Sequence, residues 1–219
     1  MTESIYLDNN ATTEVVPGVV AAMRPFLEGG FGNPSSSHSL SRDLAEMIGS
    51  ARESVAALVG ARLPSEIIFT SGGTESDNWA IIGALKANPD KKHLITTTVE
   101  HEAVRKLCRA LESDGYQVTW LGVDENGAID LEELRASLTE KTAVVSIMTA
   151  NNETGVLFNV SDAARVVKEN SSALFHTDAV NAAGKEYVAN TRVYHLLQSN
   201  GIVAFAIAAC PLWSNGTGR

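Results

Sequence analysis

The stretch Ile67-Ile68-Phe69-Thr70-Ser71-Gly72-Gly73-Thr74-Glu75-Ser76 decides the fold that we expect for this chain. Its apolar start predicts a buried strand over residues 66–70. Two glycines follow, and a helical spacing of apolar residues then runs from Thr74 to about residue 87. A glycine-rich turn between a strand and a helix leaves backbone N–H groups available at the positive end of the helix dipole. The stretch therefore predicts a phosphate-binding turn.

This turn differs from the two common nucleotide-binding motifs. No Gly-Lys-Ser/Thr follows the glycines, which excludes the Walker loop of a nucleotide hydrolase, and the G-x-G-x-x-G spacing of a dinucleotide site is missing. A phosphorylated cofactor of another kind fits better. Taken alone, the turn is also compatible with a plain connection, since glycines often serve as turn residues after a strand.

Composition and charge exclude several classes of protein. The 219 residues are 44% apolar and 20% charged, as in a soluble globular protein with one domain. A net charge of −9 without any basic run argues against nucleic-acid and membrane partners. Two cysteines suggest no disulfide framework, so we expect a cytoplasmic protein. No signal peptide is evident at the N-terminus, and the longest apolar run, Ile202 to Cys210, is far shorter than the roughly 20 residues of a transmembrane helix.

Helical and strand-like segments alternate along the middle of the chain. Gly60 is the expected end of one helix, Asp130 with Glu133 forms a capping box for another, and Ser161-Asp162 caps a third. The expected helices cover 40–59, 74–87, 103–111, 130–138 and 161–168, and the expected strands cover 66–70, 94–99, 117–123, 142–148 and 173–177. This order predicts an α/β fold with a mostly parallel sheet flanked by helices.

Polar residues follow four of the expected strands. They are the glycine turn with Thr74, then Glu100-His101, then Asn151 to Gly155, and finally Asp178. Each alone has an ordinary structural explanation, such as a turn or a cap. Together they match the groups that pyridoxal phosphate needs around it. In parallel α/β sheets, ligands bind at the carboxyl ends of the strands, where these residues lie. Thr74 suits the phosphate, Asp178 the pyridine nitrogen, Asn152 the phenolic oxygen and His101 the face of the ring.

Several motifs in the chain resemble those of the cysteine desulfurases, within the class V aminotransferase group of fold type I pyridoxal-phosphate enzymes. The resemblance runs from residue 5 to about 186 and implies the large domain of such an enzyme, in incomplete form. It divides the chain into an N-terminal segment (1–14), a cofactor-binding portion (15–186) and a divergent tail (187–219). The matching motifs are Tyr6 to Thr13, Gly32 to His38, Phe69 to Ser76, Glu100-His101, Asn151 to Gly155, His176 to Val180 and Ala183 to Lys185.

The resemblance also implies roles for single residues. Gly73 and Thr74 would bind the cofactor phosphate, and His101 would be the catalytic residue that stacks on the ring. Asn152 would contact the phenolic oxygen, Asp178 would pair with the ring nitrogen, and Asn181 stands where the family usually has glutamine.

The implied reaction converts L-cysteine to L-alanine and leaves sulfur as a persulfide on an enzyme cysteine. That sulfur would serve iron–sulfur cluster assembly or tRNA thiolation through an acceptor protein. The implied assembly is a homodimer, and no metal is expected.

Other residues depart from the family pattern. Lys185 is the only lysine after Asp178, and its Gly-Lys context is not that of the family's Schiff-base lysine. Cys108 lies in an apolar helical pattern and Cys210 in an apolar run, so neither suits the persulfide role. We expect this chain alone to be inactive and its tail to derive from a truncated or out-of-frame gene.

Two other functions stay open at this point. One is a non-catalytic fragment of the same family that binds pyridoxal phosphate without a covalent bond or pairs with another subunit. The other is an unrelated phosphate- or nucleotide-binding α/β module, which would leave His101, Asn152 and Asp178 unexplained.

Overall fold

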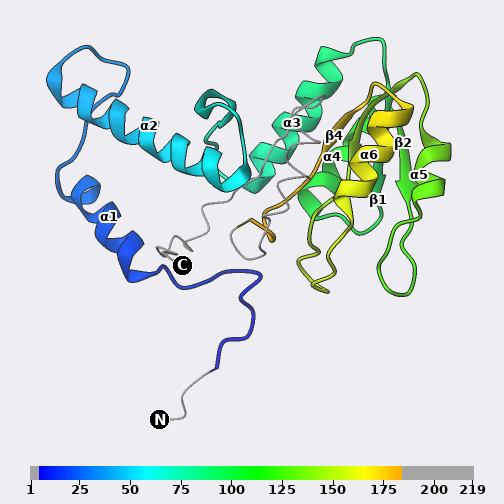
Figure 1. Cartoon of the computed structure of the whole chain (residues 1–219), viewed down its shortest axis with the longest axis horizontal. Helices are drawn as coiled ribbons and strands as arrows, with labels where there is room; N and C mark the ends of the chain where they lie inside the picture. The colour runs from blue at the N-terminus through cyan, green and yellow to red at the C-terminus, as the bar shows by residue number, and fades with distance from the viewer. Residues whose placement is uncertain (1–4, 184–219) are drawn as a thin grey trace. The chain divides into compact units, whose positions relative to one another are not determined.

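The computed structural model describes residues 5–183 (Figure 1). The chain divides into two compact units, one ending at Phe69 and the next beginning at Thr70. The predicted tail over 187–219 lies outside the described residues, as do Lys185 and Cys210. In the part of the chain that is described, no helix has both the length and the apolar character needed to cross a membrane.

Among the described residues of the first unit, the regular elements are helices. They are α1 (Pro17–Glu28), α2 (Ser39–Val59) and the short 3-10 helix η1 (Pro64–Glu66). Gly60 ends α2 in the left-handed conformation, with φ of 68°, and its N–H donates to Ala56 O. The predicted helix over 40–59 is thereby confirmed. The sequence patterns gave no signal for α1, which begins with Pro17 at a position where the fixed φ of proline suits a helix.

The predicted strand over 66–70 is wrong. Ile67 to Thr70 form no strand, and Ile68 and Phe69 are 56% and 49% exposed. A strand exists through hydrogen bonds to a neighbour, and none of the described strands pairs with this segment. The segment is held by α2 instead, because the Arg52 guanidinium donates to Ile67 O and lies 5.0 Å over the Phe69 ring.

The second unit carries a parallel sheet of four strands in the order β2-β1-β3-β4. This arrangement confirms the predicted α/β fold. Each strand begins within one residue of the predicted start and ends one or two residues earlier than predicted. The strands are β1 (His93–Thr97), β2 (Gln117–Leu121), β3 (Thr142–Ser146) and β4 (Leu174–His176).

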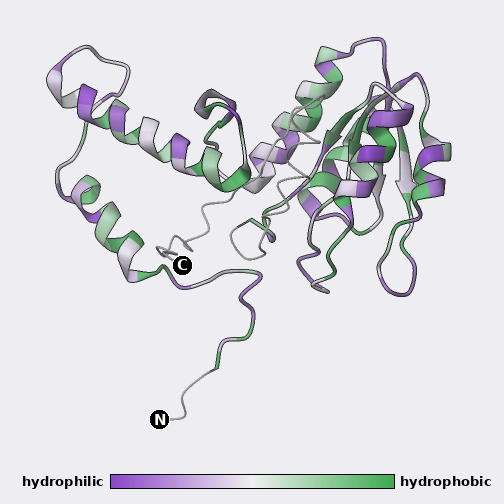
Figure 2. Cartoon of the chain, in the orientation of Figure 1, coloured by the Kyte–Doolittle hydropathy of each residue, from purple (hydrophilic) through white to green (hydrophobic). Residues whose placement is uncertain are grey.

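Two pairs of helices flank this sheet (Figure 1). The first pair is α3 (Gly73–Ala87) with α4 (Glu102–Ser113), and the second is α5 (Leu131–Ser137) with α6 (Val160–Asn170). Figure 2 shows hydrophobic and hydrophilic residues alternating along these helices, as expected for helices with one buried face.

Capping residues explain where two of these helices begin. Asp130 Oδ1 accepts hydrogen bonds from the N–H groups of Glu132 and Glu133, which confirms Asp130 as the predicted cap of α5. The prediction that Ser161-Asp162 caps α6 is wrong, because the cap is Asn159, whose Oδ1 accepts from Asp162 N–H. Asp162 instead lies in the first turn, where its charge interacts favourably with the helix dipole.

The core of the second unit lies between α3, α4 and the central strands. Ile81, Leu94 and Val104 are fully buried there. Cys108 belongs to the same cluster, and burial raises the pKa of its thiol to about 12. This confirms the packing role predicted for Cys108, since a thiol that stays protonated is a poor nucleophile.

Leu94→Ala tests this core. Because the new cavity would lie between β1 and the helices, we expect the free energy of unfolding to fall by about 2–5 kcal/mol. Urea unfolding followed by circular dichroism measures the change. Leu157→Ala is the control, since Leu157 is 55% exposed and its removal should cost no more than about 0.5 kcal/mol. Equal losses in the two variants would contradict the assignment of Leu94 to the core.

Candidate functional site

The carboxyl ends of β1, β3 and β4 meet at one edge of the sheet, because all three strands are parallel. Hydrogen bonds join the residues that follow β3 and β4. Thr149 N–H donates to Asp178 O at 2.8 Å, and the hydroxyls of Thr149 and Thr177 lie 2.8 Å apart. The backbone at Asp178 is therefore fixed relative to the end of β3.

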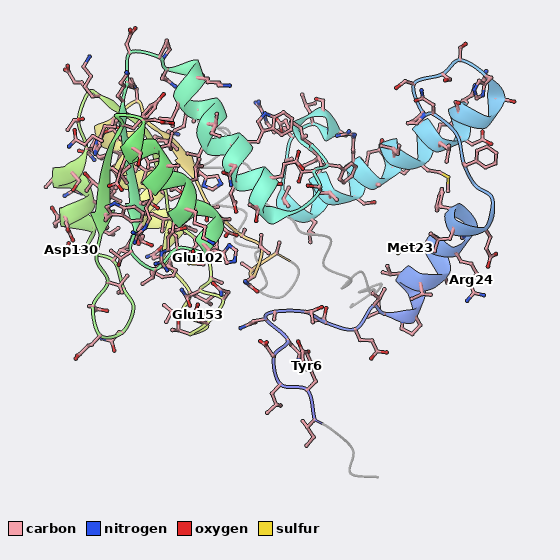
Figure 3. All side chains as sticks on the ribbon, turned by 180° about the vertical axis from the view of Figure 1, so that it is seen from behind. Tyr6, Met23, Arg24, Glu102, Asp130 and Glu153 are labelled. Atoms are coloured by element: carbon pink, nitrogen blue, oxygen red, sulfur yellow. The ribbon has the colours of Figure 1, made fainter. Side chains whose placement is uncertain are left out.

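The residues after β1 are joined to those after β3 in the same way. Glu100 Oε1 accepts from Met148 N–H at 2.9 Å, and Asn151 Nδ2 donates to Val99 O at 3.0 Å. Figure 3 labels Glu102 and Glu153, the neighbours of His101 and Asn152 in the chain, at the same end of the second unit in that view. Three of the strand ends that the sequence singled out are thus tied together.

His101 is an exposed residue at the start of α4. Its Nδ1 accepts a hydrogen bond from Ala103 N–H at 3.2 Å, so the imidazole caps its own helix. A ring nitrogen that accepts carries no proton, which leaves Nε2 as the protonated nitrogen in this tautomer. The ring is oriented by the backbone and its surface stays accessible to a flat ligand.

The loop after β3 is organised by Asn151, a buried residue to which the sequence had given no role of its own. Its Oδ1 accepts from the N–H groups of Glu153 and Thr154, at 2.9 and 2.8 Å. Gly155 turns the chain with φ of 74°, a left-handed conformation that suits glycine. This loop presents Asn152 in a half-buried position.

Asp178 follows β4 and is 5% exposed. Its Oδ1 accepts from Val180 N–H at 2.9 Å. Burial raises the pKa of Asp178 above its usual range, and the Asp77 carboxylate raises it further, while Val180 N–H and the imidazoles of His176 and His101 oppose the shift.

Asn181 comes three residues after Asp178, in the turn that follows β4. It is half-buried, and it takes part in an interaction of its own.

The start of α3 is open to an anion. Gly72 occupies the cap position and supplies no side-chain cap, and a Cβ added there would meet no atom within 4 Å. Gly73 and Thr74 form the first turn, where backbone N–H groups have no partner within the helix. Ser71 donates from both its N–H and its hydroxyl to Glu75 Oε2, each at 2.6 Å, and these bonds lower the pKa of Glu75.

A buried pair joins α3 to β4. Asp77 Oδ1 lies 3.5 Å from His176 Nε2, and the two side chains are 1% and 2% exposed. His176 Nδ1 lies 2.8 Å from the Ser146 hydroxyl. The sequence gave Asp77 and His176 no role, because their proximity depends on the packing of a helix against a distant strand. A charged residue at position 77, in helical spacing with Ile81 and Leu85, was the signal that the sequence offered.

These residues fit pyridoxal phosphate as a set. The uncapped start of α3 and the Thr74 hydroxyl suit a phosphate, and the buried Asp178 carboxylate suits a cationic ring nitrogen. The exposed His101 suits the face of a ring. Among the described residues, no group of three His, Cys, Asp or Glu side chains is arranged to hold a metal ion.

Comparison with known proteins shows the family to which the chain belongs. The family model for aminotransferase class-V matches residues 5–193. The cysteine desulfurase of Nostoc sp. is 56% identical over 181 residues, which are 83% of this chain and 45% of that protein. Cysteine desulfurase NifS of Azotobacter vinelandii is 53% identical over the same shares. The chain spans about half the length of the curated relatives that it matches.

Solved structures show the same likeness. A NifS-like protein superposes with a TM-score of 0.79 at 41% identity, covering 83% of this chain and 50% of that one. SspA in complex with cysteine superposes with a TM-score of 0.78 at 38% identity, covering 82% of this chain and 51% of that one.

Asp77→Asn tests the electrostatics of the buried carboxylates. Because the Asp77 carboxylate raises the pKa of Asp178, its removal should lower that pKa. Carbon-13 NMR of the Asp178 carboxyl, recorded against pH, measures the change. Asp90→Asn, in an exposed turn, is the matched control and should leave the midpoint in place. A midpoint that stayed constant or rose in Asp77→Asn would contradict the proximity of the two carboxylates.

Proposed function

This chain belongs to the class-V aminotransferase family, and we propose that it is part of the cofactor-binding domain of a cysteine desulfurase. One observation carries the proposal. Hydrogen bonds join the segment before His101, the Asn152 loop and the backbone of the buried Asp178 at one edge of the sheet. Enzymes of this family use pyridoxal 5'-phosphate, and the cofactor-binding portion would be residues 15–186.

Each candidate residue then has a role toward that cofactor. Gly73 and Thr74 would hold the phosphate at the start of α3 through N–H groups and a hydroxyl. The Asp178 carboxylate would accept a hydrogen bond from the ring nitrogen and keep it protonated. When bound, pyridoxal phosphate supplies the electron-withdrawing ring that labilises bonds at the substrate α-carbon.

The remaining residues would orient the ring and handle protons. His101 would stack on the ring face with its Nε2–H available for proton transfer. Asn152 and Asn181 would lie near the phenolic oxygen. The amide of Asn181 is one methylene shorter than that of the glutamine usual in the family, so its reach depends on the turn that follows β4.

The proposed substrate is L-cysteine. A protein of similar structure, SspA, was solved in complex with cysteine. The products would be L-alanine and a persulfide on an enzyme cysteine, which an acceptor protein would collect for iron–sulfur cluster assembly or thiolation. We further propose a homodimer in the cytoplasm.

We propose that the 219-residue chain alone binds the cofactor without a covalent bond and does not turn over. Lys185 stands in a Gly-Lys context that differs from that of the family's Schiff-base lysine, and the Cys108 thiol, with a pKa near 12, is unsuited to carry a persulfide. The alternative within the same family is a non-catalytic fragment that pairs with another subunit. An unrelated phosphate-binding module is disfavoured by the family match.

Titration with pyridoxal phosphate tests the proposed site. We expect a change in the cofactor's visible spectrum that dialysis reverses, and no permanent labelling after borohydride treatment. Asp178→Ala should weaken binding by roughly tenfold, about 1.4 kcal/mol, because the ring nitrogen loses its anionic partner. Asp90→Ala, an exposed aspartate, is the control. Permanent labelling would overturn non-covalent binding, and equal affinity of Asp178→Ala and native chain would overturn the role of Asp178.

Exposed apolar side chains in the first unit lead us to expect that the chain associates with itself. Its α1 exposes large apolar side chains, among them Met23, labelled in Figure 3, and Phe26 and Leu27. Exposed apolar surface of this kind favours contact between chains. We expect dynamic light scattering to show growing particle size as the protein concentration rises. A monodisperse monomer at high concentration would contradict this expectation.

A further inference from the structure

Glu100 is a buried glutamate to which none of the roles above applies. It lies directly before His101 and is 3% exposed. Its Oε1 accepts two hydrogen bonds of 2.9 Å, one from the Thr97 hydroxyl at the end of β1 and one from Met148 N–H after β3. One side chain thus joins its own strand end to the neighbouring strand end.

A second link lies beside it. Asn151 Nδ2 donates to Val99 O, the carbonyl next to Glu100 in the chain. The two links run between the same pair of segments, so together they resist both sliding and rotation of one segment against the other. His101 follows directly on one segment, and Asn152 follows directly on the other. The relative position of these two side chains therefore depends on the Glu100 bridge to Met148.

The surroundings of Glu100 favour the neutral acid. The pKa of Glu100 is raised to about 8, mainly by burial; the carboxylates of Asp178 and Asp77 also act to raise it, and the bonds from Met148 and Thr97 act to lower it. The charged groups that act on Glu100 from α3 and from beyond β4 are both acidic, Asp77 and Asp178. Glu100 in turn raises the pKa of Cys108 on α4.

The second carboxyl oxygen of Glu100 also favours the neutral acid. Glu100 Oε2 is buried and has no hydrogen-bond partner among the described residues. An ionised oxygen in such a place costs more free energy than an unpaired neutral hydroxyl.

We propose that Glu100 is a positioning residue, held as a neutral carboxylic acid, that fixes the His101 segment to the Asn152 segment. The proposal rests on the proposed function for what His101 and Asn152 do toward pyridoxal phosphate. As a neutral group, Glu100 adds no negative charge to that of Asp77 near the Asp178 carboxylate.

Amide hydrogen exchange tests the bridge without any cofactor. Glu100→Ala should speed exchange of Met148 N–H tenfold or more, because its acceptor is lost. Glu100→Gln keeps the Oε1 acceptor and replaces the acid hydroxyl by NH₂, so exchange should stay within about twofold of the native rate. Thr97→Val removes the second donor to Glu100 Oε1 and leaves the Met148 bond in place, so exchange of Met148 N–H should speed only a few-fold. This variant serves if Glu100→Ala fails to fold. Glu169→Gln, exposed on α6, is the matched control.

The protonation state has its own signature. Because the pKa of Glu100 is higher in the folded chain than in the unfolded chain, the folded state holds an additional proton from about pH 4.5 to about pH 8. The free energy of unfolding of the native chain, relative to that of Glu100→Gln, therefore falls as pH rises through that window. The ratio of the two unfolding constants should change by up to about tenfold per pH unit and then level off.

The outcomes separate the two proposals. Unchanged Met148 exchange in Glu100→Ala, failure of Glu100→Gln to restore it, or a ratio of unfolding constants independent of pH would each overturn the role of Glu100. Absence of pyridoxal phosphate binding by the native chain would overturn the proposed function instead. Where the native chain does bind, Glu100→Ala should weaken binding about tenfold and Glu100→Gln less than twofold.

Discussion

The structure depends on hydrogen bonds that join neighbouring strand ends at one edge of a parallel sheet. A parallel sheet brings its carboxyl ends together, but it does not by itself fix the loops that follow them. Here Glu100 bonds to Met148 across β1 and β3, and Thr149 bonds to Asp178 across β3 and β4. Because these groups are buried, each bond replaces water that the group lost on folding, and a displaced loop would leave a polar group unpaired.

The same edge gathers three buried carboxylates, Asp77, Glu100 and Asp178, which would repel one another if all were ionised. Their surroundings differ enough to separate them. Asp77 has the His176 imidazole 3.5 Å away, Glu100 has a pKa near 8, and Asp178 receives a backbone N–H. Differences of this kind let one carboxylate serve a cationic ligand while its neighbours stay neutral or paired.

Local patterns predicted what local interactions determine. The Asp130 cap, the Gly60 helix end and the alternation of helices and strands from α3 onward are all governed by neighbours in the chain, and all are confirmed. The strand over 66–70 failed because a strand requires a partner that its own sequence cannot specify. The pairing of Asp77 with His176 was equally out of reach, since it arises only when α3 packs on β4.

The dipeptide Glu100-His101 shows how an exposed side chain is oriented without being buried. Glu100 anchors the strand end through its side chain, and His101 begins α4 by accepting from Ala103 N–H. These constraints on adjacent residues limit the freedom of the imidazole, although His101 is exposed. Packing would have covered the face of the ring. Hydrogen bonds at its edge and at its neighbour fix the direction of the ring while keeping that face open, which is the requirement for stacking on a flat cofactor.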